Sequence, residues 1–160
     1  VLIMYPKYIM LELSLIFFSW NFIFGKITIV VGLIIFCYAL SNFLRRTSPI
    51  ATNGLYSKIR HPQYLGLITI TLGFTLMSIE QALKITILDT WLISLVGYVL
   101  LAYCEEKHLL KEHHELYKQY MEKTHFMLPI NPPKNFPETL FTMIFMLSIA
   151  LLCSIFLSTF

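Results

Sequence analysis

Two short stretches of the sequence gather most of the side chains that could bind a charged ligand or move a proton. The first, NGLYSKIRHPQYLG, runs from residue 53 to residue 66 and carries Arg60 and His61 directly before Pro62. A guanidinium and an imidazole can donate to an anion such as a carboxylate. Proline suits the first turn of a helix, where a backbone N–H would be unpaired anyway, and Gly66 permits close backbone approach. This stretch predicts an anion site at a helix entrance.

The second stretch, YCEEKHLLKEHHELYKQY, runs from residue 103 to residue 120 and contains Glu105 and Glu106. A carboxylate at the end of an apolar helix is costly unless it pairs with a cation, a hydroxyl or water. Neighbouring residues of a helix diverge by about 100 degrees, so the two glutamates should have different roles. We expect Glu106 to serve the ligand, while Glu105 meets solvent or Lys111.

Each stretch also has a plainer interpretation when it is taken alone. Basic residues beside membrane helices often contact lipid phosphate, which would account for Arg60 and His61. The glutamates would then be a solvated helix end that pairs with Lys107 or Lys111. The two stretches gain significance only if the fold brings them together.

The rest of the chain has the composition of a membrane protein. Of its 160 residues, 57% are hydrophobic and 13% are charged, against about 25% charged residues in ordinary globular domains. About 20 apolar residues cross the hydrocarbon core as a helix, and runs of about this length lie at 8–24, 27–44, 63–79, 85–103 and 138–160. We expect an all-α polytopic membrane protein with about five transmembrane helices and tight turns at Asn21–Lys26 and Glu80–Lys84.

Lysine and arginine are divided unequally among the connecting segments. Ten lie in the N-terminal segment and the two long loops, and two, Lys26 and Lys84, lie in the short turns. Cytoplasmic loops carry the excess of Lys and Arg, so we expect the N-terminus and both long loops in the cytoplasm. The formal net charge of +3 then reflects topology, and we expect no nucleic-acid partner. The three cysteines have the spacing of neither a disulfide framework nor a metal site.

The expected helices at 63–79 and 85–103 form a hairpin whose two open ends face the same side. The stretch before the hairpin and the stretch after it must therefore be neighbours. Beyond the glutamates, apolar residues recur at helical spacing among charges from residue 109 to residue 122. This pattern predicts an interfacial amphipathic helix that could cover the site.

Together the two stretches resemble the integral membrane methyltransferases, which include isoprenylcysteine carboxyl methyltransferase and the phospholipid methyltransferases. The first is similar to that family's Gly-x-Tyr followed by Arg-His-Pro-x-Tyr-x-Gly. The second matches its order and spacing with EEKHL, then Tyr117, Tyr120 and the LP at Leu128 and Pro129. The resemblance covers about residues 53–129 of one domain spanning residues 1–160. An additional apolar run, 138–160, follows where many relatives stop.

The resemblance implies S-adenosylmethionine as methyl donor, bound at the cytoplasmic end of the hairpin, and a lipophilic acceptor that arrives from the bilayer among the membrane lipids. The catalytic residues it implies are Glu106, Glu105 and Arg60. The cofactor-binding residues it implies are His61, Tyr64, Leu65, Gly66, Glu105, Glu106, His114, Tyr117 and Tyr120. Where many relatives have Phe-Gly, this chain has His113 and His114.

Methyl transfer mainly requires alignment of the reactants and exclusion of water. An amine acceptor must in addition lose a proton, and Glu105, Glu106, His113 and His114 are candidates to take it. The acceptor stays open among a prenylcysteine carboxylate, a lipid amine, a small thiol and a quinone-like or sterol-like lipid.

Two other classes of function fit the same features. One is a membrane reductase that uses NADPH, although the sequence has no glycine-rich dinucleotide fingerprint. The other is a non-catalytic membrane subunit that binds lipid. Binding of S-adenosylmethionine, of NADPH or of neither separates the three.

Overall fold

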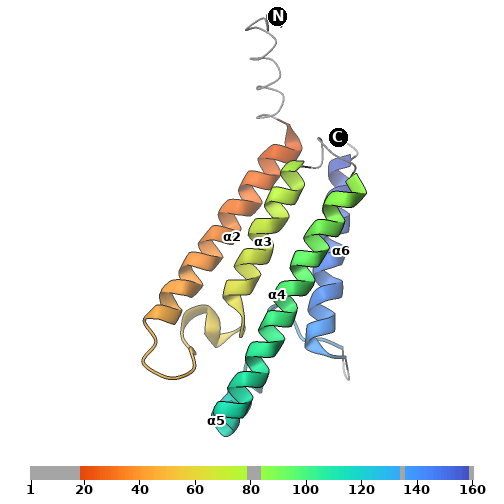
Figure 1. Cartoon of the computed structure of the whole chain (residues 1–160). Helices are drawn as coiled ribbons and strands as arrows, with labels where there is room; N and C mark the ends of the chain where they lie inside the picture. The colour runs from red at the N-terminus through yellow and green to blue at the C-terminus, as the bar shows by residue number, and fades with distance from the viewer. Residues whose placement is uncertain (1–18, 79–83, 134–135, 159–160) are drawn as a thin grey trace, which may run out of the picture.

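A computed structural model describes residues 19–78, 84–133 and 136–158, and the regular elements in these ranges are helices. The elements in chain order are α2 (Trp20–Leu44), the short 3-10 helix η1 (Gly54–Ser57), α3 (Pro62–Ser78), α4 (Lys84–Glu112), α5 (His114–Met121) and α6 (Glu138–Ser158). Figure 1 shows α2, α3, α4 and α6 as long rods, with the loop after α2, η1, α5 and the start of α6 at one end. The predicted all-α fold is confirmed.

One helix in the described part of the chain, α2, is long and apolar enough to cross a membrane. Large apolar side chains such as Ile34 and Leu44 are exposed on its surface. The expectation of several spans stays a prediction. The predicted span at 8–24 lies largely outside the described residues, as does the turn at Glu80–Lys84, of which Lys84 begins α4.

The predicted turn at Asn21–Lys26 is wrong, because these residues form the first turns of α2. The helix begins one residue after Ser19, whose hydroxyl accepts a hydrogen bond from the backbone N–H of Phe22 at 3.4 Å. Such a cap satisfies one of the N–H groups that a helix start leaves unpaired. Gly25 is buried within the helix.

Four glycines hold α2 and α3 together as an antiparallel pair, Gly25 and Gly32 on one helix and Gly66 and Gly73 on the other. A Cβ added at Gly32 would lie 2.8 Å from the backbone N of Ile70 and 2.9 Å from the carbonyl O of Gly66. One added at Gly73 would lie 2.7 Å from the carbonyl O of Gly25. Small residues let helix backbones approach closely where lipid offers no hydrophobic driving force.

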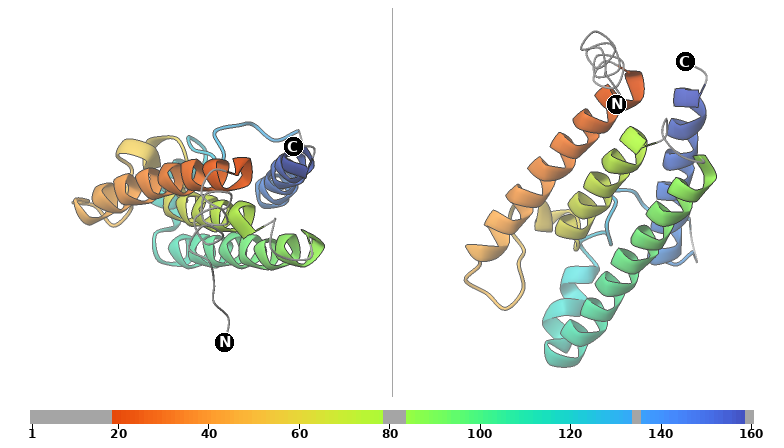
Figure 2. Two further views of the ribbon diagram at one scale, coloured as in Figure 1. Left: turned by 90° about the horizontal axis from the view of Figure 1, so that it is seen from above. Right: turned by 45° about the horizontal axis from the view of Figure 1, so that its top comes forward.

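The hydrophobic core lies between α3, α4 and α6. Trp91, Leu95 and Val99 of α4 pack with Ile68 of α3 and with Met146 of α6. Phe126 and Met127, from the segment that joins α5 to α6, complete the same cluster. Figure 2 shows α3 between α2 and α4, so α3 carries the glycine contact on one face and the core on another.

The amphipathic helix predicted for residues 109–122 is divided in the structure. Leu109 and Leu110 belong to α4, which continues to Glu112, and α5 begins at His114. The break falls at His113, whose backbone angles (φ −131°, ψ 46°) are not helical. The change of direction lets α5 bury Tyr117 against the rest of the protein while Leu116 stays exposed.

Replacement of Gly73 by Ala should destabilise the protein, because the new methyl group meets backbone atoms of α2 that cannot yield without separating the helices. We expect a loss of about 1–3 kcal/mol in the free energy of unfolding, measured by denaturant titration in detergent. Gly97→Ala is the matched control, since a Cβ there meets nothing within 4 Å and alanine favours a helix by about 0.5–1 kcal/mol. Equal effects of the two variants would contradict close backbone packing.

Candidate functional site

The segment before α3 is fixed by backbone hydrogen bonds to the segment after α5. The N–H of Arg60 donates to the carbonyl O of His125 at 2.8 Å, and that of His61 donates to the carbonyl O of Phe126 at 3.1 Å. In return the N–H of His125 donates to the carbonyl O of Lys58 at 3.0 Å. This short parallel contact holds the entrance of α3 against the region that follows α5.

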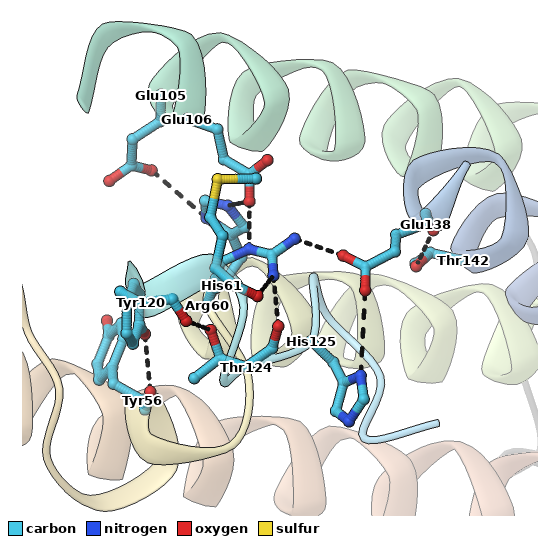
Figure 3. A network of polar contacts seen from close by, with 11 residues as sticks. Tyr56, Arg60, His61, Glu105, Glu106, Tyr120, Thr124, His125, Glu138 and Thr142 are labelled. Atoms are coloured by element: carbon cyan, nitrogen blue, oxygen red, sulfur yellow. Dashed lines mark hydrogen bonds and ion pairs between the residues drawn. The ribbon is translucent and has the colours of Figure 1, made fainter. Parts of the chain in front are cut away.

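The Arg60 side chain joins three parts of the fold although it is only 3% exposed. Its Nε donates to Oε1 of Glu106 on α4 at 2.5 Å. Its Nη1 donates to the carbonyl O of Thr124 at 2.5 Å and to that of Met121 at 3.3 Å. Its Nη2 donates to Oε2 of Glu138 at the start of α6. Figure 3 shows the guanidinium between the two carboxylates.

The Glu106 side chain is 8% exposed. One oxygen of its carboxylate contacts both Arg60 and His61. Oε1 receives Nε of Arg60 and lies 3.2 Å from Nε2 of His61. Burial alone would raise the pKa of Glu106, but the hydrogen bonds and charges of His61 and Arg60 outweigh burial and hold the pKa below its ordinary value. Glu106 is therefore an ionised, buried acceptor.

The His61 ring stands between the two glutamates. Its Nε2 faces Glu106, and its Nδ1 lies 3.7 Å from Oε2 of Glu105. The ring is 4% exposed and packs edge-on to Phe126, with 5.0 Å between the ring centres. Glu105 is 42% exposed. One nitrogen of His61 therefore faces a buried carboxylate, and the other nitrogen faces a carboxylate that is open to solvent. Figure 3 shows both contacts.

A cavity of about 520 Å³ opens beside this network, within the range of small-molecule sites. Its aromatic lining consists of Phe43, Tyr56, Tyr64, Tyr117 and Tyr120. Its ionisable lining consists of Arg46, Arg60, His61, Glu105, His108, Glu112 and His113. Aromatic faces and carboxylates favour a cationic ligand group. Arg46, which stacks on Phe43 with its guanidinium carbon 3.8 Å from the ring centre, favours an anionic one. The cavity suits a ligand that carries both signs of charge.

The tyrosines of the cavity are uncharged donors at physiological pH. Burial, followed by the charge of Glu105, raises the pKa of Tyr56 above its ordinary value. Burial, followed by the charge of Glu106, does the same for the pKa of Tyr117. Tyr120 donates its hydroxyl to the carbonyl O of Tyr56 at 2.7 Å and so ties α5 to η1 across the cavity.

Comparison with known proteins gives the family. A model of the phospholipid methyltransferase family matches residues 26–116, more than half of the chain. The chain belongs to the phospholipid methyltransferase family. The match contains Arg60, His61 and both glutamates, and it ends before Tyr117 and Glu138. Comparisons with curated proteins and with solved structures found no match.

Six residues that the sequence proposed for the methyltransferase site line the cavity: Arg60, His61, Tyr64, Glu105, Tyr117 and Tyr120. Four others do not. Leu65 packs against the core, Gly66 faces α2, and His114 is 69% exposed beside Glu115. The fourth is Glu106, which contacts Arg60 and His61; its expected role toward the ligand stays a prediction. Glu105 faces the cavity, and Glu106 meets Arg60 rather than the ligand space.

Sequence reasoning missed other residues of this candidate site. Tyr56 lay in the quoted Gly-x-Tyr motif, and Arg46 had been counted only toward topology. His113, which the sequence offered only as a candidate proton acceptor, lines the cavity, and His114 does not. Glu138 had no signal that could connect it to Arg60, 78 residues away in the chain.

Arg60→Met should destabilise the protein strongly, because it leaves Glu106 as a buried charge without its main partner. The expected loss is about 3–5 kcal/mol in the free energy of unfolding. The double variant Arg60→Met/Glu106→Gln should recover part of this loss, since it removes the uncompensated charge. Lys58→Met, at an exposed position in the same segment, should stay within about 0.5 kcal/mol of the wild type. An Arg60→Met loss no larger than that of Lys58→Met would show that the ion pair contributes nothing.

Proposed function

We propose that this methyltransferase uses S-adenosylmethionine to methylate the amine of a membrane phospholipid. Methyl transfer follows from the family, whereas the donor, the acceptor and the membrane face belong to the proposal. The family's description favours a phospholipid among the acceptors that the sequence left open. In a phospholipid head group, the group that gains methyl groups is an amine.

The observation that carries the proposal is the cavity between the two stretches. S-adenosylmethionine has a sulfonium, an ammonium and a carboxylate, and the lining offers a partner to each. The sulfonium and the ammonium suit the aromatic faces of Tyr64 and Tyr117 and the carboxylate of Glu105. Arg46, in the loop just after α2, suits the carboxylate. The volume of about 520 Å³ is adequate for a ligand of this size class.

When bound, S-adenosylmethionine supplies an electrophilic methyl group on a positively charged sulfur. The protein's task is then to align the acceptor with that group and to keep water away. Tyr120 and Tyr56 close one wall of the cavity through their hydrogen bond. Arg60 and Glu106 act as positioning residues, because they lock the entrance of α3 against α4.

The proposal places the cavity at the cytoplasmic face of a bilayer crossed by α2, α3, α4 and α6. Its support is the unequal division of lysine and arginine, which favours the end that carries the loops. The common end of these loops in Figure 1 fits that arrangement. A lipid head group could then reach the cavity while its acyl chains stay among the apolar helix surfaces.

Purified protein in lipid nanodiscs should retain tritiated S-adenosylmethionine and transfer the label to the lipid. Mass spectrometry of the lipid should show a gain of one CH2 for each methyl group, in nanodiscs that contain phosphatidylethanolamine. Retention of NADPH instead would favour the reductase, and retention of neither would favour a non-catalytic lipid-binding subunit. Label found on a carboxylate or a thiol would contradict the amine as acceptor but would support S-adenosylmethionine as the donor.

Arg46→Ala should weaken the binding of tritiated S-adenosylmethionine, because the donor's carboxylate loses its cationic partner. A hydrogen bond to a charged group contributes about 1.5–3 kcal/mol, which is roughly one to two decades in the dissociation constant. Arg45→Ala is the matched control, since Arg45 is exposed and is not part of the cavity lining. Equal affinities in both variants would assign the carboxylate to another donor.

A further inference from the structure

The two nitrogens of His61 have different surroundings, and the difference fixes where its proton sits. Nε2 lies 3.2 Å from Glu106 Oε1. An ionised carboxylate can only accept, so the hydrogen of a neutral His61 lies on Nε2. Nδ1 then carries the lone pair. Its distance of 3.7 Å from Glu105 Oε2 is too long for a hydrogen bond, so Nδ1 is available on the side where Glu105 lines the cavity.

His61 lies in a network that holds more carboxylates than cations. Glu105, Glu106 and Glu138 carry three negative charges in this network, and Arg60 carries one positive charge (Figure 3). A proton that His61 accepts from a ligand would lie on Nδ1. Nε2–H then keeps its bond to Glu106, and the new Nδ1–H points toward Glu105, which is open enough to solvent to pass the proton on.

We propose that His61 is the general base that deprotonates the acceptor amine, and that Glu106 is the residue that orients it. The inference rests on the proposed function. The ammonium of the acceptor gives its proton to Nδ1 of His61. The freed nitrogen lone pair forms the new C–N bond to the methyl carbon, while the C–S bond of the sulfonium donor breaks and its electron pair stays on sulfur. The proton leaves His61 for solvent by way of Glu105.

The other candidates for this role are less well placed. Glu105 is 42% exposed, whereas His61 is 4% exposed and one of its nitrogens faces the buried Glu106. His108 is exposed and lies 3.2 Å from Glu112 at the surface of α4. His114 lies outside the cavity lining. In His61, a buried carboxylate holds one nitrogen and leaves the other toward the ligand, which is the arrangement that orients catalytic histidines in general.

The test is His61→Gln, which keeps an N–H donor toward Glu106 but has no nitrogen that titrates. The turnover number at neutral pH should fall roughly 10²- to 10⁴-fold, while the dissociation constant of tritiated S-adenosylmethionine stays as in the wild type. Turnover should recover as the pH is raised, because the amine then loses its proton to water. The groups that face His61 and bear on this profile are Arg60, Tyr64, Glu105 and Glu106.

Two further variants sharpen the test. His114→Asn removes an exposed imidazole that is not part of the cavity lining and should leave the shape of the pH profile as in the wild type. Glu106→Gln should lower turnover with the same recovery at high pH, and it replaces His61→Gln if the latter does not fold. The double variant His61→Gln/Glu106→Gln should be no slower than His61→Gln alone, because both changes act through one group.

Three results would overturn the inference. Loss of S-adenosylmethionine binding in His61→Gln would make His61 a ligand of the donor. Full turnover at neutral pH would exclude it as the base, and a loss without recovery at high pH would show a different defect. A wild type that binds no S-adenosylmethionine would refute the proposed function itself. A wild type that methylates only a carboxylate would keep S-adenosylmethionine as the donor and refute both the amine acceptor and the base.

Discussion

The buried charge of Arg60, shared between Glu106 and Glu138, is the interaction on which the candidate site depends. A guanidinium with 3% of its side chain exposed would be strongly destabilising without partners, because desolvation of an ion costs several kcal/mol. The partners come from α4, from α6 and from the carbonyls after α5. Segments that only loops connect are therefore held in one arrangement, and the walls of the cavity follow from it.

The helix pair α2 and α3 supplies the fixed base for this arrangement. Gly32 and Gly66 bring the two backbones together near the entrance of α3, and Gly25 and Gly73 do so near its far end. Because the two contacts lie on one face of each helix, the opposite face of α3 is free to pack on Trp91 and the core. Phe43 at the end of α2 and Arg46 just after it line the cavity, so the glycine contacts also position part of the cavity wall.

The sequence predicted the meeting of the two stretches because a helical hairpin leaves little choice: the segments at its open ends must be neighbours. Local patterns were less reliable where a tertiary contact decided. The division of the apolar residues into two runs favoured a turn at Asn21–Lys26, but these residues lie in α2, where Gly25 contacts α3. The apolar spacing after Glu106 favoured one helix through residue 122, but burial of Tyr117 requires the break at His113. Glu138 had no local pattern at all, since its partner is defined only by the packing of α6.

The different positions of the two glutamate side chains follow from the packing of α4 in the core. Trp91, Leu95, Val99 and Ala102 form the buried face of α4, with spacings of three and four residues that keep them on one side of the helix. Glu106 comes four residues after Ala102 and continues that face, which is why it points toward Arg60. Glu105 is rotated away by about 100 degrees and reaches the cavity. The phase of an apolar stripe thus places one carboxylate in the buried network and its neighbour at the cavity, a signal that was present in the sequence. A shift of α4 by one residue would exchange the two, so the packing of Trp91 in the core and the contacts of His61 with the two glutamates are parts of one constraint.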